Sequence, residues 1–355
     1  MTRIVAVHGV LPAHYYEQSD ITTAFADMCL PPDRDRGVLE RLHGTSRVRG
    51  RHLALPLERY ASLGGFGQAN DVFIETAQRL GEEAVTGALE QAGLSAADID
   101  LVVFTSVTGI AAPSVEARLA GPLGLRPDVK RVPIFGLGCV AGAAGIARVH
   151  DYLVGHPDQV ALLLSVELCS LTLQRTDASV QNLVAGALFG DGAAALLAVG
   201  RDRAHLGGGP PAPEVVATRS RLYPGTERLL GWDIGDSGFR IVLGADLPDL
   251  VRVHLGEEVR SFLADHDLKS QDVTAWVCHP GGPKVLDAVR EALDLPARSL
   301  ELTWDSLADV GNLSSASVLH ILRDTLALRP PPPGTPGLLL AMGPGFSTEL
   351  VLLRW

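Results

Sequence analysis

The sequence lacks a block of like charges, a pair of cysteines spaced for metal binding and an apolar run long enough to cross a membrane. Its net charge is −11, which argues against nucleic acid as the main partner. The four cysteines are scattered without C-x-x-C spacing, so a zinc site or a disulfide framework is not expected. No segment reaches about 18 unbroken apolar residues, and we therefore expect no membrane span and a soluble, cytoplasmic protein.

The composition supports a large folded core. Of the 355 residues, 46% are hydrophobic and 20% are charged, which is enough for two domains or one large two-lobed unit. Apolar strand-like runs alternate with amphipathic helical runs, a pattern typical of an α/β layered fold. Strands are expected at residues 1–10, 101–106, 160–165, 193–198, 275–279 and 338–342, helices at 70–92, 113–123, 141–154, 247–265, 283–293 and 314–325, and surface loops at 207–213 and 329–337.

The two halves of the chain repeat each other weakly. The segment 80–83, predicted to open a helix, leads to 94–99 and a strand, and 255–258 leads in the same way to 268–273 and a strand. The small-residue turn around Cys139 then has a counterpart around Asn312. A repeat of this length predicts a duplicated domain with a pseudo-twofold axis, where Cys139 and Asn312 would sit on two buried helices.

Cys139 stands in a turn of small residues, 136–145, between an apolar strand-like stretch and a helical pattern. Glycine and alanine on every side leave room for another molecule to approach the sulfur. A thiol at the start of a helix feels the helix dipole and unpaired backbone N–H groups, which favour the nucleophilic thiolate. The alternative is a small buried hydrophobe in a tight turn, because free cysteine is often simply buried.

Two further residues stand in similar places. His279 ends an apolar strand and is followed by Pro-Gly-Gly-Pro, which gives a ligand close access to that edge of the sheet. The alternative is a strand-ending histidine whose ring bonds to the backbone. Asn312 lies within Gly-Asn-Leu-Ser, where asparagine taken alone is better interpreted as a helix N-cap.

Together these segments resemble the type III polyketide synthases, the chalcone-synthase-like branch of the thiolase fold. The resemblance covers nearly the whole chain and rests on five segments in the family's order and spacing: 138–139, 188–192, 279–283, 311–316 and 343–346. It implies an α/β fold of duplicated αβαβα layered halves with pseudo-twofold symmetry. Residues 1–206 would form the half carrying the cysteine, and residues 207–355 the half carrying histidine and asparagine. The resemblance also implies a homodimer.

The resemblance further implies an acyltransferase that loads an acyl group from coenzyme A onto Cys139, decarboxylates malonyl-CoA and joins the two by Claisen condensation. His279 would pair with the thiolate and lower its pKa. Asn312 and His279 would donate hydrogen bonds to the malonyl thioester oxygen, where enolate charge develops. Acyl-CoA and malonyl-CoA are then the substrates, and no metal or redox cofactor is needed. The chain looks most like actinobacterial members that make alkyl α-pyrones or resorcinols from fatty acyl starters.

Phe189 and Phe239 match the family's gate between the coenzyme A tunnel and the cavity, where apolar walls exclude water and favour loss of carbon dioxide. For Phe189 alone, core packing is the alternative. The positions that align with the family's pocket carry small side chains: Thr108, Ala112, Cys169, Thr172 and Ser314. Plant relatives commonly have a bulky Met in place of Ala112, so we expect a tunnel for a long alkyl group, each buried methylene contributing about 0.8 kcal/mol.

Coenzyme A needs cations for its phosphates. Arg47, Arg49 and Lys284 are the candidates, with a solvated basic face as the alternative.

Three other classes of protein stay open. An initiating ketoacyl synthase shares Cys-His-Asn but hands its product to a carrier protein, and the Phe189 gate and the 343–346 loop argue against it. An acyl-CoA thioesterase or a Cys-His-Asn amidase would need an activated water and no malonyl site. A non-catalytic binding protein of the same fold would not need Cys139, His279 and Asn312 together.

Overall fold

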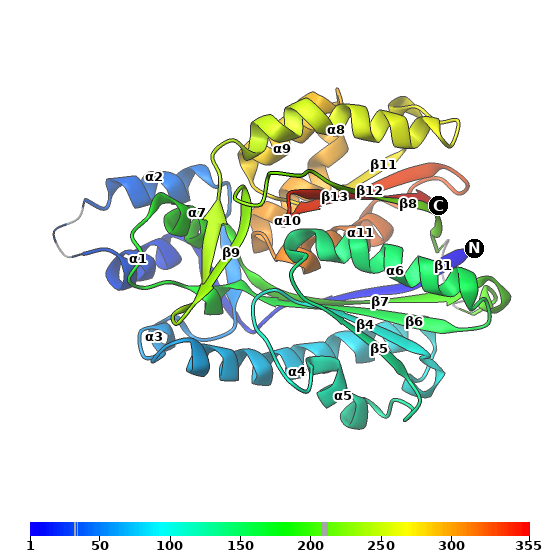
Figure 1. Ribbon diagram of the computed structural model, residues 1–355, viewed down its shortest axis with the longest axis horizontal. Coiled ribbons are helices and arrows are strands. Elements are labelled where there is room, and N and C mark those ends of the chain that lie inside the picture. The colour runs from blue at the N-terminus through cyan, green and yellow to red at the C-terminus, as the bar shows by residue number, and fades with distance from the viewer. Residues whose placement is uncertain (32, 34, 207–211) are drawn as a thin grey trace.

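The computed structural model describes residues 1–31, 33, 35–206 and 212–355. Helices and strands alternate in layers (Figure 1). One outer face is covered by α4 (Phe66–Ala92) and α5 (Val115–Leu123), and the other by α8 (Leu247–Ala264) and α9 (Pro283–Ala292). The central layer contains α6 (Ala141–Gly155) and α11 (Ser317–Leu328). This arrangement confirms the predicted α/β layered class.

Nine strands form one sheet in the order β11-β12-β13-β8-β1-β7-β6-β4-β5. Their bounds are β1 (Thr2–Val10), β4 (Leu101–Thr105), β5 (Lys130–Ile134), β6 (Val160–Leu168), β7 (Asp191–Gly200), β8 (Glu214–Leu222), β11 (Ala275–Cys278), β12 (Pro336–Gly343) and β13 (Ser347–Arg354). β4 is parallel to β6, which pairs antiparallel with β7. β11 is likewise parallel to β12, which pairs antiparallel with β13. The pairing pattern therefore repeats in the two halves.

The two halves of the sheet join at a short contact. Within the described residues, β1 pairs with β8 through Thr2 and Arg3 alone. The larger contact between the halves is the central layer, where α6 and α11 pack on strands of both. One close approach in that layer requires glycine, because a Cβ at Gly142 would lie 2.2 Å from the backbone oxygen of Ser315.

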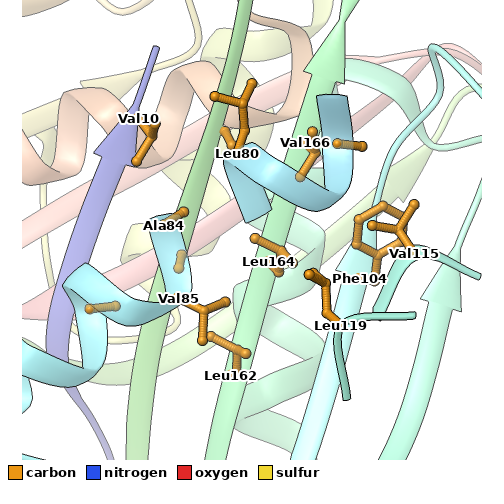
Figure 2. Packing of buried hydrophobic residues seen from close by; sticks show 14 of the residues in the cluster. Val10, Leu80, Ala84, Val85, Phe104, Val115, Leu119, Leu162, Leu164 and Val166 are labelled. Atoms are coloured by element: carbon orange, nitrogen blue, oxygen red, sulfur yellow. The ribbon is translucent and has the colours of Figure 1, made fainter. Parts of the chain in front are cut away.

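β6 is apolar at most positions instead of alternating, with Ser165 and Glu167 as its polar residues. Leu162, Leu164 and Val166 pack beneath α4 and α5 in a cluster that Figure 2 shows. Ala161 and Leu163 point to the other face and join the core around the central helices. Successive side chains of a strand point to opposite faces, so a strand covered on both sides is apolar on both faces.

The predicted repeat is present, although its helix starts were wrong. Leu80 and Leu255 lie inside α4 and α8, which begin at Phe66 and Leu247. Both helices nevertheless lead into equivalent 3-10 turns, 96–98 and 270–272. In each turn an aspartate accepts a hydrogen bond from a backbone N–H three residues earlier, at 2.9 Å in the first and 2.8 Å in the second.

A second group of elements gathers at one side of the layers (Figure 1). It comprises α1 (Gln18–Cys29), α2 (Gly37–Thr45), α7 (Val180–Leu188) and the hairpin of β9 (Leu230–Gly235) and β10 (Gly238–Leu243). The remaining elements are β2 (His14–Glu17), β3 (Gly50–Leu53), α3 (Leu57–Tyr60) and α10 (Glu301–Val310). Of the predicted loop at 207–213, all but the last two residues lie outside the described part. No helix in the described ranges is long and apolar enough to span a membrane.

Candidate active site

Cys139 lies in a 3-10 turn, Gly138–Val140, that leads directly into α6. Its side chain is buried yet lines a small cavity of about 20 Å³. The cavity wall also includes Thr108, Cys169, Phe189, Trp232, Ile241 and Ser314. The structure thus brings five of the predicted site residues to one place: Cys139, Thr108, Cys169, Phe189 and Ser314.

A hydrogen-bonded chain runs from the thiol into the core. The Cys139 thiol donates to the Ser314 hydroxyl at 3.6 Å, and Ser314 donates to Glu167 at 3.2 Å. Glu167 is fully buried and also accepts from Thr108 Oγ1 at 2.9 Å and from Ser315 Oγ at 2.5 Å. Ser314 has a φ of 49°, a left-handed conformation that side-chain-bearing residues seldom adopt. Such strain is typical of functional sites, where surrounding contacts hold it in place.

Burial decides the protonation of the two candidate proton-transfer groups. It raises the pKa of the Cys139 thiol to about 12, against a smaller lowering effect of the Ser314 hydrogen bond. It lowers the pKa of His279 to about 3. At neutral pH both groups are therefore uncharged. The expectation that His279 pairs with the thiolate is not met here, since no hydrogen bond joins the two side chains among the described residues and the thiol bonds to Ser314 instead.

His279 follows the last residue of β11 and is 2% exposed. Its backbone N–H donates to the Leu340 carbonyl at 2.9 Å, which fixes it to the neighbouring strand β12. Its ring Nδ1 has no hydrogen-bond partner in the described part of the chain. A ring bonded to the backbone through Nδ1, one form of the alternative considered from the sequence, is therefore not present.

Asn312 is fixed at both its backbone and its side-chain oxygen. Its N–H donates to the Leu188 carbonyl at 2.8 Å, and its carbonyl accepts from Gly190 N at 3.0 Å. These bonds clamp it beside Phe189. Its Oδ1 accepts from Ser314 N at 2.8 Å, a local turn contact, whereas the N-cap position of the 3-10 turn at 314–316 belongs to Leu313. The same bond orients the amide and leaves Nδ2 with no acceptor among the described residues, available to donate to a substrate.

Phe239 belongs to an aromatic cluster at the side of the cavity. Its ring lies 5.3 Å from that of Phe66 in an edge-to-face arrangement and 5.9 Å from that of Trp232. It lines an adjoining cavity together with Thr108 and Thr172. Aromatic walls of this kind hold apolar surface against a ligand and exclude water.

Ala112 does not reach these cavities within one chain. It is exposed in the loop between β4 and α5, and it is not part of the cavity walls. The expectation that Ala112 opens a tunnel is therefore not met inside a single chain, because the loop runs along the surface.

The candidate coenzyme A cations lie close to the catalytic segments. Arg47 is exposed and stacks over the ring of Trp304 at 4.5 Å. Arg49 forms an ion pair with Asp309, three residues before Asn312. Lys284 is exposed in the first turn of α9, just after the His279 turn. In the described ranges, no group of His, Cys, Asp and Glu side chains is arranged to hold a metal ion.

Two polar residues at the site are not among the predicted site residues. Glu167 interrupts the mostly apolar strand β6, and a charge inside a fully buried strand was the signal that could have found it. Arg51, in β3, is 2% exposed and lines a cavity next to that of Cys139. Its neighbourhood is formed by α1, α7 and the β9–β10 hairpin, which local sequence patterns did not predict.

Comparison with known proteins places the chain among condensing enzymes. Residues 1–203 match the family described as chalcone and stilbene synthases, N-terminal domain, and residues 214–355 match its C-terminal domain. The chain is 62% identical to 1,3,6,8-tetrahydroxynaphthalene synthase of Streptomyces peucetius subsp. caesius over 100% of this chain and 93% of that protein. It is 28% identical to the alpha-pyrone synthesis polyketide synthase-like Pks18 of Mycobacterium tuberculosis, over 99% of this chain and 91% of that protein.

The fold agrees with solved structures of the same kind. The crystal structure of 1,3,6,8-tetrahydroxynaphthalene synthase from Streptomyces coelicolor A3(2), a bacterial type III polyketide synthase, superposes with a TM-score of 0.92. The two chains are 29% identical, and the match covers 99% of each.

Proposed function

The chain belongs to the chalcone and stilbene synthase family of type III polyketide synthases, and from this premise we propose that it makes a tetrahydroxynaphthalene from malonyl-CoA alone. As a member of this family it is an acyltransferase that uses coenzyme A thioesters. The 62% identity to a 1,3,6,8-tetrahydroxynaphthalene synthase carries the proposal on the product. The carbons of a naphthalene skeleton can all come from the two-carbon units that remain when malonyl groups lose carbon dioxide.

The first step loads the starter. Because burial raises the pKa of Cys139 to about 12, the thiol needs a proton acceptor when it attacks the thioester carbonyl. His279, whose buried imidazole is uncharged at neutral pH, is proposed as this acceptor. Coenzyme A leaves with a proton, and the starter is held on Cys139 as a thioester.

The second step forms the carbon–carbon bond. An extender malonyl-CoA loses carbon dioxide, and the resulting enolate oxygen accepts hydrogen bonds from Asn312 Nδ2 and from the His279 ring. The enolate carbon attacks the thioester on Cys139, and the thiolate leaves. Neutral donors suit this step, because they stabilise the oxyanion without handing a mobile proton to the carbanion. The extended chain, now on coenzyme A, is loaded again for the next cycle.

The cavity dimensions support a short starter. The space beside Cys139 measures about 20 Å³, and the adjoining cavity with Arg51 about 70 Å³. One water-sized group needs about 10–15 Å³, so the space beside Cys139 admits a starter of a few heavy atoms, and the adjoining cavities, including one of about 140 Å³ that Thr108 and Phe239 line, are proposed to take the growing chain.

A fatty acyl starter with closure to an α-pyrone or resorcinol is the second candidate. The similarity to an alpha-pyrone synthesis protein and the small side chains of Thr108, Cys169 and Ser314 favour it. Purified enzyme with malonyl-CoA alone, then with a ladder of acyl-CoA starters, separates the two by mass spectrometry of the products. Tetrahydroxynaphthalene from malonyl-CoA alone supports our proposal, whereas products only in the presence of a long acyl-CoA contradict it.

We propose that the chain forms a homodimer through β5. This strand is an edge of the sheet, four of its five residues are exposed, and Val132 is 44% exposed on it. Phe135, which directly follows β5, adds exposed apolar surface at 48%. An edge strand with unpaired backbone groups can pair with another chain, here a second copy. A monomer in sedimentation equilibrium at micromolar concentration, or an unchanged dimer in Val132→Lys, would contradict this placement.

Arg47, Arg49 and Lys284 are proposed to bind the phosphates of coenzyme A, because they flank the segments that carry Asn312 and His279. The division into halves at residues 206 and 207 and the cytoplasmic location stay predictions.

A further inference from the structure

Arg51 is a buried arginine, and one edge of its guanidinium group has no hydrogen-bond partner in the described part of the protein. Its side chain is 2% exposed, and Nη1 donates to the carbonyl of Phe189 at 2.6 Å. Nε and Nη2 have no hydrogen-bond partner in the described part of the protein. These two nitrogens form one edge of the planar guanidinium group, the edge whose N–H groups match the two oxygens of a carboxylate.

The protein's own carboxylate nearby is otherwise engaged. Asp191 is fully buried, and Oδ1 accepts from Ser170 N at 2.8 Å while Oδ2 accepts from Ala54 N at 2.6 Å and from the Ser170 hydroxyl. Among the described residues, no carboxylate lies within ion-pair distance of Arg51. An unpaired buried cation is costly, so a structure that keeps one beside a cavity is suited to an anionic ligand.

Arg51 lies next to the cavity of Cys139. Arg51 lines a cavity of about 70 Å³ whose wall shares Cys169, Phe189, Trp232 and Ile241 with the cavity of Cys139. Its aliphatic stem packs against Gly311, where a Cβ would lie 3.0 Å from Arg51 Cδ. Arg51 is thus in contact with the residue before Asn312 and with the carbonyl of the gate residue Phe189.

We propose that Arg51 binds the free carboxylate of a malonyl group that Cys139 carries as starter, and that it thereby selects malonyl over uncharged starters. The inference rests on the proposed use of malonyl-CoA as starter and assigns that choice to one side chain. The remaining wall of the cavity is largely apolar, including Ile21, Phe25, Leu53 and Leu57. In such surroundings one buried cation gives a carboxylate a strong advantage over a methyl group.

The test compares starters on the full-length enzyme. Wild type, Arg51→Gln and Arg51→Lys are each mixed with malonyl-CoA and acetyl-CoA in competition, and intact-protein mass spectrometry measures malonyl and acetyl groups on Cys139. Arg51→Gln is expected to lower the ratio of malonyl to acetyl loading by about tenfold or more, with acetyl loading maintained. Arg51→Lys keeps the charge but loses the pair of N–H donors that match a carboxylate, so an intermediate ratio of malonyl to acetyl loading is expected. Arg252→Gln, the same change at an exposed arginine, is the control.

A second variant keeps the proposal testable if Arg51→Gln does not fold. Ala185→Leu leaves Arg51 in place and fills the Arg51 cavity from α7, away from the wall shared with Cys139. It is expected to lower the malonyl ratio as well. Equal losses for both starters, or an unchanged ratio, would overturn the role of Arg51. Failure of the proposed product is a separate result, because it appears in the wild type as malonyl loading without tetrahydroxynaphthalene.

Discussion

In the central layer, α6 contacts the backbone before α11 closely at Gly142. The substitution Gly142→Ala is therefore a quantitative test of the site geometry. A Cβ there would lie 2.2 Å from the Ser315 backbone oxygen and 2.7 Å from Val318 Cγ1, whereas ordinary contact begins at 3.4 Å. A backbone oxygen cannot rotate away as a side chain can. The start of α6 and the turn before α11 must therefore separate by about 1 Å to admit the methyl group.

Two quantities are expected to change. The free energy of unfolding falls by about 1–3 kcal/mol, the usual cost of an extra methyl group in a packed core. The rate of condensation falls by about 100-fold, since a displacement of about 1 Å between reacting groups has that effect. The reason is that Cys139 lies three residues before Gly142, in the turn that leads into α6, and Ser314 directly precedes Ser315. One 3.6 Å hydrogen bond joins the side chains of Cys139 and Ser314.

The assays are urea unfolding followed by circular dichroism, and release of coenzyme A from malonyl-CoA. Gly155→Ala is the matched control, because it changes the same helix at a position with no neighbour within 4 Å of the added Cβ. The control is expected to keep both activity and stability. If Gly142→Ala keeps the wild-type rate and stability, the central layer does not set the distance between the two catalytic segments.

Three further predictions concern single side chains. Cys139→Ala is expected to abolish condensation with an unchanged circular dichroism spectrum; polyketide at a normal rate would refute its role as acyl carrier. His279→Gln is expected to keep part of the malonyl-CoA decarboxylation, measured as carbon dioxide release, because an amide still donates a hydrogen bond, and complete loss would contradict a hydrogen-bonding role. Burial raises the pKa of Asp191 from 3.8 to about 6, so the folded protein holds this proton more tightly than the unfolded chain does. The resulting contribution to the free energy of unfolding is complete below about pH 3.8 and is lost as the pH rises through 6, by up to about 3 kcal/mol. Urea unfolding at pH 4 and pH 7 should show this loss in the wild type relative to Asp191→Asn, and equal pH dependence in both would count against it.

The predicted layers follow from local sequence, because period and turn chemistry are local properties. The long helix α4 and the buried strands β6 and β12 were predicted within a few residues on their apolar pattern. The turn holding Cys139 was predicted from its glycines. The duplicated pairing of strands could be inferred from the repeat because equal halves fold alike.

The rest of the site depends on contacts between distant segments. Glu167 reaches Ser314 across 147 positions of the chain, and Arg51 reaches the carbonyl of Phe189 across 138. No periodicity encodes such pairs. The β9–β10 hairpin places Trp232 and Phe239 at the cavities, yet it is short and half-exposed and gives a weak pattern. Ala112 was expected in the pocket from alignment alone, and the surface course of its loop shows why that expectation failed within one chain.

The burial of the Cys139 thiol has a consequence for the enzyme at rest. Oxidants and alkylating reagents attack thiolates at exposed sites, and a thiol with a pKa of about 12 offers almost none at neutral pH. The other three cysteines are buried too, with pKa values raised by the same cause. Burial therefore disfavours a standing thiolate at Cys139, and reagents that need the thiolate are expected to modify the substrate-free protein slowly.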